Sequence, residues 1–131
     1  SAKRSIMPAS YAHRKTSPAM SCLFCKMVEG TIPAKIIVDE PDVLAFHDIR
    51  PVSPVHALVI PKKHLASLAD ATAADGALLG RLLTVAREVA EMLELKDGYR
   101  TVITTGAHGG QTVHHLHVHV LGGRHHGWPP G

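Results

Sequence analysis

Near its carboxyl terminus the chain reads His114-His115-Leu116-His117-Val118-His119-Val120-Leu121. Because a β-strand turns successive side chains to opposite faces, this alternation predicts a strand with His115, His117 and His119 on one face. The apolar residues between them would lie on the other face, against a core. Neighbours on one face are about 6 to 7 Å apart, so a phosphate group or a metal ion could touch two of these imidazoles. The stretch therefore predicts a strand that carries a reaction centre.

Histidines are concentrated in this part of the chain, since seven of the eleven fall between His108 and His126. Histidine is the side chain that most readily acts as an acid, base, nucleophile or metal ligand near neutral pH. Solvent-facing strand histidines and the remnant of an affinity tag are the alternatives, but a tag would be an uninterrupted run at a terminus. The pattern favours a functional site.

The rest of the chain predicts an antiparallel α+β domain with a sheet of about five strands. Short apolar and β-branched runs at 36–38, 43–47, 56–60 and 99–104 predict the other four strands, with turn residues between them. A short helix is expected at 24–29, ending at Gly30, and residues 106–110 are expected to form a flexible loop. One long helix follows a capping sequence at 72–75. Its apolar residues recur at spacings of three and four and are Leu78, Leu79, Leu82, Ala86, Val89 and Leu93.

The charge of the chain is unevenly distributed. The formal net charge is +3, but the first twenty residues hold four basic residues and no acid. From Met20 onward, 10 basic residues stand against 11 acidic ones, a net charge of −1. The body of the protein therefore lacks the basic surface of a nucleic-acid-binding domain. No stretch approaches the roughly 20 apolar residues of a membrane span, so no membrane partner is expected.

Residues 1–20 show no helical or strand periodicity and contain serine, alanine, proline and basic residues. Such a segment is typical of a linker, of sequence added for expression, or of a presequence remnant. We expect a non-catalytic extension before a single domain at 21–131. With only two cysteines, Cys22 and Cys25, no disulfide framework is available, which indicates a reducing interior. We expect the cytoplasm, or an organelle if the extension comes from a presequence.

Three motifs follow one another along the chain. They are His56, Pro61-Lys62-Lys63-His64, and the segment 110–124 with its pattern His-φ-His-φ-His-φ-φ, where φ is apolar. With these motifs in this order, the chain resembles the histidine-triad nucleotide-binding family over about residues 22–131. Phe46-His47-Asp48-Ile49 and the closing Trp128-Pro129-Pro130-Gly131 resemble its Hint branch. The resemblance implies an α+β fold whose two protomers join their sheets in a homodimer. It also implies hydrolysis or transfer at the phosphorus of a purine nucleoside phosphoramidate or related nucleotide.

The resemblance further implies roles for individual residues. His117 would attack the α-phosphorus to give a covalent nucleotidyl-histidine, which water then cleaves. His119 would contact the phosphate and protonate the leaving group, while His56 and His115 orient and polarise the central ring. The glycine-rich segment 109–112 can bring backbone N–H groups and a hydroxyl to the phosphate oxygens. The nucleotide site implied by the family comprises Asp48 for the ribose together with Ile49, Leu23, Phe24, Met27, Phe46, Gly110, Gln111, Thr112 and Thr104.

Three positions depart from the usual Hint pattern. Thr104 stands where asparagine is common, Thr112 where serine is common, and His114 where tyrosine is common. Thr112 keeps a hydroxyl, whereas Thr104 loses an amide donor. We expect these changes to affect leaving-group preference and rate more than the type of reaction.

Some members of the superfamily hold a structural zinc ion, and the corresponding residues here are Cys22, Cys25, His64 and His115. Two thiolates and two imidazoles complete a tetrahedral zinc site with no open position, so such an ion would be structural. Catalysis would then require no cofactor. Two reduced, packed cysteines are the alternative.

Two other functions stay open at the level of sequence. A nucleotide-binding regulatory module would use the same pocket with negligible turnover. A metal-dependent hydrolase would use His115, His117 and His119 as ligands, with water in the fourth position. A covalent nucleotidyl intermediate would distinguish the favoured phosphorus-directed enzyme from both.

Overall fold

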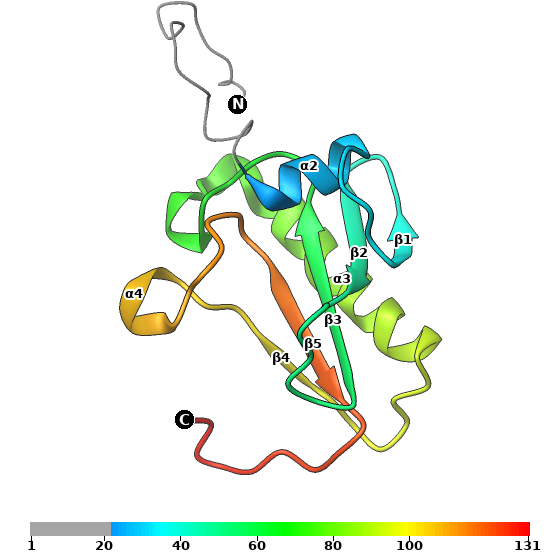
Figure 1. Ribbon diagram of the computed structural model, residues 1–131. Coiled ribbons are helices and arrows are strands. Elements are labelled where there is room, and N and C mark those ends of the chain that lie inside the picture. Colours follow the sequence, from blue (N-terminus) through cyan, green and yellow to red (C-terminus); the bar gives the residue numbers. More distant parts are fainter. Residues whose placement is uncertain (1–21) are drawn as a thin grey trace, which may run out of the picture.

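The computed structural model describes residues 22–131, so the predicted extension at 1–20 lies outside the described residues (Figure 1). Five strands form one antiparallel sheet in the order β1-β2-β3-β5-β4. The strands are β1 (Ile36–Asp39), β2 (Val43–His47), β3 (Val55–Pro61), β4 (Arg100–Val102) and β5 (Val118–Gly122). The helices are α2 (Leu23–Glu29), α3 (Gly76–Met92) and α4 (Gly106–Gly109), with 3-10 turns at Leu68–Asp70 and Ala73–Asp75. The predicted α+β fold, with one long helix and one short helix near its start, is confirmed.

The sheet is covered on both faces, and α2 and α3 lie on opposite sides of it (Figure 1). Alternate side chains of the central strands enter two separate cores, as the pleat of a strand requires. The α3 core contains Val43, Ala45, Ala57, Val59, Val118 and Val120 of the sheet, packed with Leu82, Val85, Ala86, Val89 and Ala90. The α2 core contains Leu44, Phe46, Leu58 and Ile60 of the sheet, packed with Phe24 and Met27. By this alternation, His56 and His119 lie on the α2 face.

Local sequence signals set the ends of the helices. Gly30 ends α2 with a φ of 83°, a conformation that favours glycine. Thr72 and Asp75 form the predicted capping box, in which the Thr72 backbone N–H donates to the Asp75 carboxylate over 2.9 Å. The box caps the 3-10 turn Ala73–Asp75, and α3 follows directly at Gly76. Of the predicted apolar positions of α3, Leu82, Ala86 and Val89 are buried, and Leu78, Leu79 and Leu93 pack at the edge of the core.

Three local predictions need correction. The histidine-rich stretch is a strand only from Val118, so His115 and His117 precede the β-ladder. A hydrogen bond outside the ladder holds the segment before Val118, because the Leu116 N–H donates to the carbonyl of Leu65 over 2.6 Å. Residues 106–109 form the one-turn α4 where a flexible loop was expected. The strand predicted at 99–104 is shorter, because β4 covers only 100–102.

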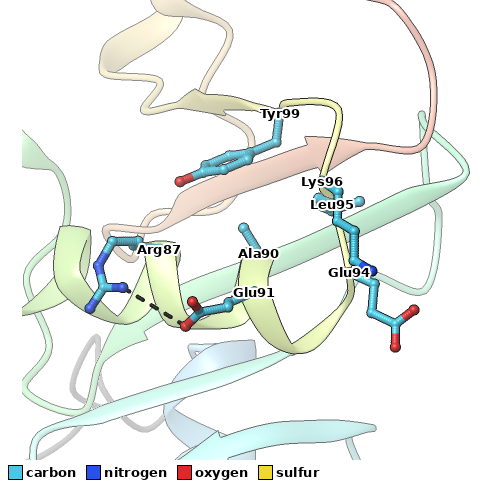
Figure 2. Close-up of a pocket in the computed structure, with 7 residues that line it drawn as sticks. All are labelled: Arg87, Ala90, Glu91, Glu94, Leu95, Lys96 and Tyr99. Carbon is cyan, nitrogen blue, oxygen red and sulfur yellow. Dashed lines mark ion pairs between the residues drawn. The ribbon is translucent and has the colours of Figure 1, made fainter.

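The outer side of α3 and the start of β4 enclose a shallow hollow of about 460 Å³ (Figure 2). Arg87 and Glu91 of α3 form an ion pair on one side of it, and the ring of Tyr99 lies on the other. None of the histidines among residues 22–131 lines this hollow. Within residues 22–131, no helix is both long enough and apolar enough to cross a membrane.

Candidate functional site

His117 is held by the backbone of its own segment. Its Nδ1 lies 2.6 Å from the carbonyl oxygen of His115, and because a carbonyl only accepts, Nδ1 must carry a proton. Burial lowers the pKa of His117, which favours a neutral ring at pH 7. In a neutral imidazole protonated at Nδ1, the other nitrogen bears a free lone pair. His117 therefore presents an unprotonated Nε2, the form that a nucleophile needs.

The ring of Phe24, in α2, packs against His115 and His117. It lies edge-on to His117, with centroids 5.3 Å apart and an interplanar angle of 89°. The same ring contacts His115 at 5.9 Å and Phe46 at 5.4 Å. These contacts restrict the orientation of the His117 ring, which is 5% exposed. Helix α2 thus orients His117 as well as filling a core.

His119 lies between His117 and His56. The His117 and His119 ring centroids are 4.8 Å apart, and Nδ1 of His119 is 2.9 Å from Nε2 of His56. The Asp48 carboxylate lies 3.4 Å from the same Nε2. Burial, followed by the charges of His117 and His56, lowers the pKa of His119 to about 4. Burial also lowers the pKa of His56, although Asp48 opposes this shift. The three imidazoles are therefore neutral at pH 7.

The apolar residues expected to bind the base occupy two kinds of position. Phe24, Met27 and Phe46 are buried members of the α2 core. Leu23 and Ile49 are 41% and 77% exposed, so these two present apolar surface to solvent. The structure therefore buries three of the five predicted residues and leaves two of them exposed.

The glycine-rich loop is organised by Gln111. Its side-chain amide donates to the carbonyls of Ala66 and Val113 and accepts from the Gly106 N–H, at 2.7, 3.0 and 3.0 Å. The backbone N–H groups of Gly110 and Gln111 donate to carbonyls of α4, both over 3.1 Å. These donors are thus engaged within the loop.

The remaining loop positions have different exposures. Thr112 is exposed and Thr104 is partly buried. A Cβ on Gly109 would lie 3.7 Å from the Thr104 backbone, so the loop packs close to the end of β4. The Thr112 hydroxyl therefore lies on an exposed residue of this loop.

Four side chains from three separate segments converge beneath α2. The Sγ atoms of Cys22 and Cys25 and the Nδ1 atoms of His64 and His115 all lie within 4.8 Å of one another. Sulfur-to-nitrogen distances are 3.2 to 3.5 Å, and the two nitrogens are 3.2 Å apart. A tetrahedral zinc ion requires about 3.6 Å and about 3.3 Å for these separations. The distances are close to those that zinc needs.

The tautomer of His115 also suits a metal ligand. Its Nε2 donates to the carbonyl of Pro61 over 2.8 Å, which leaves the Nδ1 lone pair facing the cysteines. Burial raises the pKa of Cys22, but the His115 and His64 rings outweigh this effect and lower it to about 5. Burial and the charge of Cys22 raise the pKa of Cys25 to about 12. A dication would remove the repulsion that opposes ionisation of the second thiol.

Comparison with known proteins identifies the family. The family model of the HIT domain matches residues 29–126. This chain belongs to the HIT family. An uncharacterised HIT-like protein of Synechococcus elongatus is 52% identical over 109 residues, which cover 83% of this chain and 96% of that protein.

Solved structures agree with this assignment. A HIT family hydrolase from Legionella pneumophila superposes with a TM-score of 0.83 at 46% identity, covering 85% of this chain and all of that one. A histidine triad nucleotide-binding protein from Candida albicans gives a TM-score of 0.72 at 30% identity, with 83% of each chain covered. The predicted superfamily is confirmed, whereas the Hint branch stays a prediction.

Cys22 and Cys25 precede the matched HIT domain and reach His64 and His115 inside it, as the zinc site implied by the resemblance requires. One feature of this HIT protein lies beyond what the sequence patterns indicated. The backbone N–H of Val52 donates to Nδ1 of His56 over 3.1 Å, and no motif singles out this residue. Every residue has the same backbone amide, so no compositional signal could have found it.

Proposed function

We propose that this HIT protein is a hydrolase of purine nucleoside phosphoramidates that acts at the α-phosphorus through a covalent nucleotidyl-His117 intermediate. The hydrogen bond from His117 Nδ1 to the His115 carbonyl is the observation that carries the proposal, because it leaves Nε2 free to attack. The relatives named as a hydrolase and as a nucleotide-binding protein support the same class of activity.

The proposed reaction has two displacements at phosphorus. In the first, the Nε2 lone pair of His117 forms a bond to the α-phosphorus, and the bond from phosphorus to the amine nitrogen breaks. When the anionic phosphate lies beside His119 it raises the pKa of this ring, which takes up a proton with the substrate and gives one from Nε2 to the departing amine. In the second, a water oxygen attacks phosphorus, the bond to Nε2 breaks, and the water proton returns to His119. The products are a nucleoside monophosphate and an amine, and both histidines are restored.

The geometry gives little support to a hydrolase with the three triad histidines as metal ligands. Within residues 22–131, the metal-binding donor atoms that converge to within 4.8 Å belong to two other groups. His115 directs Nδ1 toward the cysteines and Nε2 toward Pro61, while His117 uses Nδ1 to bond a carbonyl. A binding module without turnover remains the competing function, and it requires an experiment to exclude.

The test is intact-protein mass spectrometry after rapid mixing with an adenosine phosphoramidate, with AMP release followed in parallel. We expect an adenylyl adduct on the parent protein, and neither adduct nor AMP release with His117→Ala. His108→Ala, at an exposed histidine of α4, serves as the matched control and should behave as the parent. Turnover that survives in His117→Ala would contradict the mechanism. Bound nucleotide without turnover in the parent would establish the binding module.

We further propose that Cys22, Cys25, His64 and His115 hold a structural zinc ion. The converging donors, the bare Nδ1 of His115 and the lowered pKa of Cys22 support this assignment. The ion would tie the start of α2 to the segment that bears His117, and all four of its positions would be filled by protein. Catalysis would then need the ion only for structure.

Metal analysis of the purified protein tests the zinc site. We expect one zinc per chain, and we expect a Cys22→Ser, Cys25→Ser double variant to lose it and to unfold at a lower temperature. Ser21→Ala is the control, because it changes the residue next to Cys22 in the chain without removing a proposed zinc ligand. Retention of zinc by the double variant would refute the assignment.

We also propose that two copies associate through β4. This strand forms one edge of the sheet and, within the described chain, pairs only with β5. Exposed edge strands are templates for pairing with another chain. The apolar side chains that flank β4 in the chain, Tyr99 and Ile103, are 42% and 37% exposed. Two such edges would join the sheets of two protomers.

A further inference from the structure

The loop between β2 and β3 reaches the site through its backbone. It contains Val52, whose N–H donates to Nδ1 of His56 over 3.1 Å. A nitrogen that accepts from an N–H bears a lone pair, so the proton of neutral His56 is on Nε2. That Nε2 is 2.9 Å from Nδ1 of His119. His56 therefore donates to His119.

The same argument then applies to His119. Because its Nδ1 accepts from His56, the proton of neutral His119 is on Nε2. The depressed pKa values of both rings support the neutral forms. His117 has the opposite tautomer, since its Nδ1 donates to a carbonyl. Nε2 of His117 therefore bears a lone pair, whereas Nε2 of the neighbouring His119 bears a proton.

The loop that carries Val52 is held by the carboxyl-terminal segment. Ser53 is 7% exposed, and its hydroxyl is hydrogen-bonded to Nε2 of His126 at 2.9 Å. Pro54 packs so closely on Gly123 that a Cβ there would lie 2.8 Å from the proline ring. Farther along, Arg100 of β4 donates to the carbonyl of Gly127 over 2.5 Å. The segment after β5 is therefore fastened on both sides of His126.

We propose that His126 and Ser53 are positioning residues that hold the Val52 N–H against His56, and that this contact places the proton of His119 on Nε2. The consequence for leaving-group protonation rests on the proposed function above. The tautomers themselves do not, because they follow from contacts in the free protein.

This assignment also decides what a second donor cluster can do. Atoms of Asp48, His56 and His119 lie within 4.8 Å of one another and could in principle hold a metal ion. A metal on Nε2 of His56 would displace its proton to Nδ1, where it would oppose the Val52 N–H. In this cluster His56 accepts from the Val52 N–H and donates to Nδ1 of His119, so it connects the loop backbone to His119.

Long-range proton–nitrogen NMR of the ¹⁵N-labelled, substrate-free protein, above neutral pH, measures the tautomer of each histidine. We expect Nε2–H forms for His56 and His119 and the Nδ1–H form for His117. We also expect scalar coupling across the hydrogen bond between the Val52 nitrogen and Nδ1 of His56. His119 in the Nδ1–H form would overturn the proposal, even if phosphoramidate turnover were intact.

Variants then test the role of the carboxyl-terminal segment. We expect Ser53→Ala and His126→Ala to give a mixture of His119 tautomers. We also expect each variant to slow hydrolysis of a substrate with an amine leaving group by about 10-fold, which is less than the full contribution of a general acid. The rate of hydrolysis should fall less than about 2-fold for a substrate whose leaving group needs no proton, such as p-nitrophenolate. Ser53→Thr and His126→Gln, which retain hydrogen-bonding groups, should restore part of the effect.

His125→Ala is the matched control, because His125 is the exposed neighbour and its side chain is outside this network. Wild-type tautomers in both alanine variants would refute the role of Ser53 and His126. Equal losses with the two substrates would also refute it, since they would indicate general damage to the site. An absence of turnover in the parent, with the expected tautomers present, would refute the proposed function and leave the tautomer assignment standing.

Discussion

His119 shows how three neighbours set the properties of one side chain. Burial and the adjacent rings of His117 and His56 lower its pKa to about 4, whereas an unfolded chain gives histidine about 6.5. The unfolded chain therefore binds a proton between these pH values that the folded chain does not bind. Acid must favour unfolding in this window, and the stability due to neutral His119 is fully present only above about pH 6.5.

We predict that lowering the pH from 7 to 4 reduces the free energy of unfolding by about 3 kcal/mol through His119 alone. Replacement by His119→Gln removes the titrating group, so this variant should lose correspondingly less stability over the same range. Urea denaturation at several pH values measures the difference. Parallel pH profiles for the two proteins would show that His119 does not have the depressed pKa.

At this scale the sequence predicted which residues lie close together better than how they are arranged. The alternating histidines and the family motifs brought His56, His117, His119 and Asp48 to one site, as the structure has them. The alternation did not show that the His115 ring faces the cysteines while the His117 ring lies beside His119. It depends on two carbonyls, those of Pro61 and His115, and backbone atoms leave no trace in residue identity.

Among the elements, β5 differs most from its prediction. Alternation of polar and apolar residues continues from His115 to Val120, but the ladder with β3 begins at Val118. Leu116 is still 1% exposed, so its side chain enters the α3 core without a ladder around it. Burial alone produces the alternating pattern, which is why periodicity could not locate the start of the strand. Helix α3 was predicted more closely, because a capping box and a long apolar stripe agree on its position.

Helix α3 offers a direct test of the core that supports β5. Leu82 is 2% exposed and packs in the α3 core, so Leu82→Ala should reduce the free energy of unfolding by about 2 to 5 kcal/mol. The same substitution at Leu68, which is 40% exposed on a 3-10 turn, should cost less than about 1 kcal/mol. Chemical denaturation of both variants checks the difference. Similar losses would mean that α3 does not supply the main core.

Across the whole molecule, the two faces and the two edges of the sheet have different tasks. The α3 face is filled with apolar side chains, while the α2 face combines a smaller core with the histidines and the cysteine-containing cluster. The histidines and the cysteines therefore lie away from the hollow beside α3, which is lined by charged residues together with Ala90, Leu95 and Tyr99 (Figure 2). Tyr99 immediately precedes β4, the edge at which we propose that two copies associate.

Tyr99→Asp tests association at that edge. A two-fold symmetric interface carries each substitution twice, so the loss of one aromatic contact and the added charge should raise the Kd of the dimer about 1000-fold. Ile36→Asp is the matched control, because Ile36 is 51% exposed on β1 at the opposite edge of the same sheet. Sedimentation equilibrium should then find the parent and Ile36→Asp as dimers and Tyr99→Asp as a monomer at the same concentration. A reversal of these two results would place the interface at β1, and a monomeric parent would refute the proposed association.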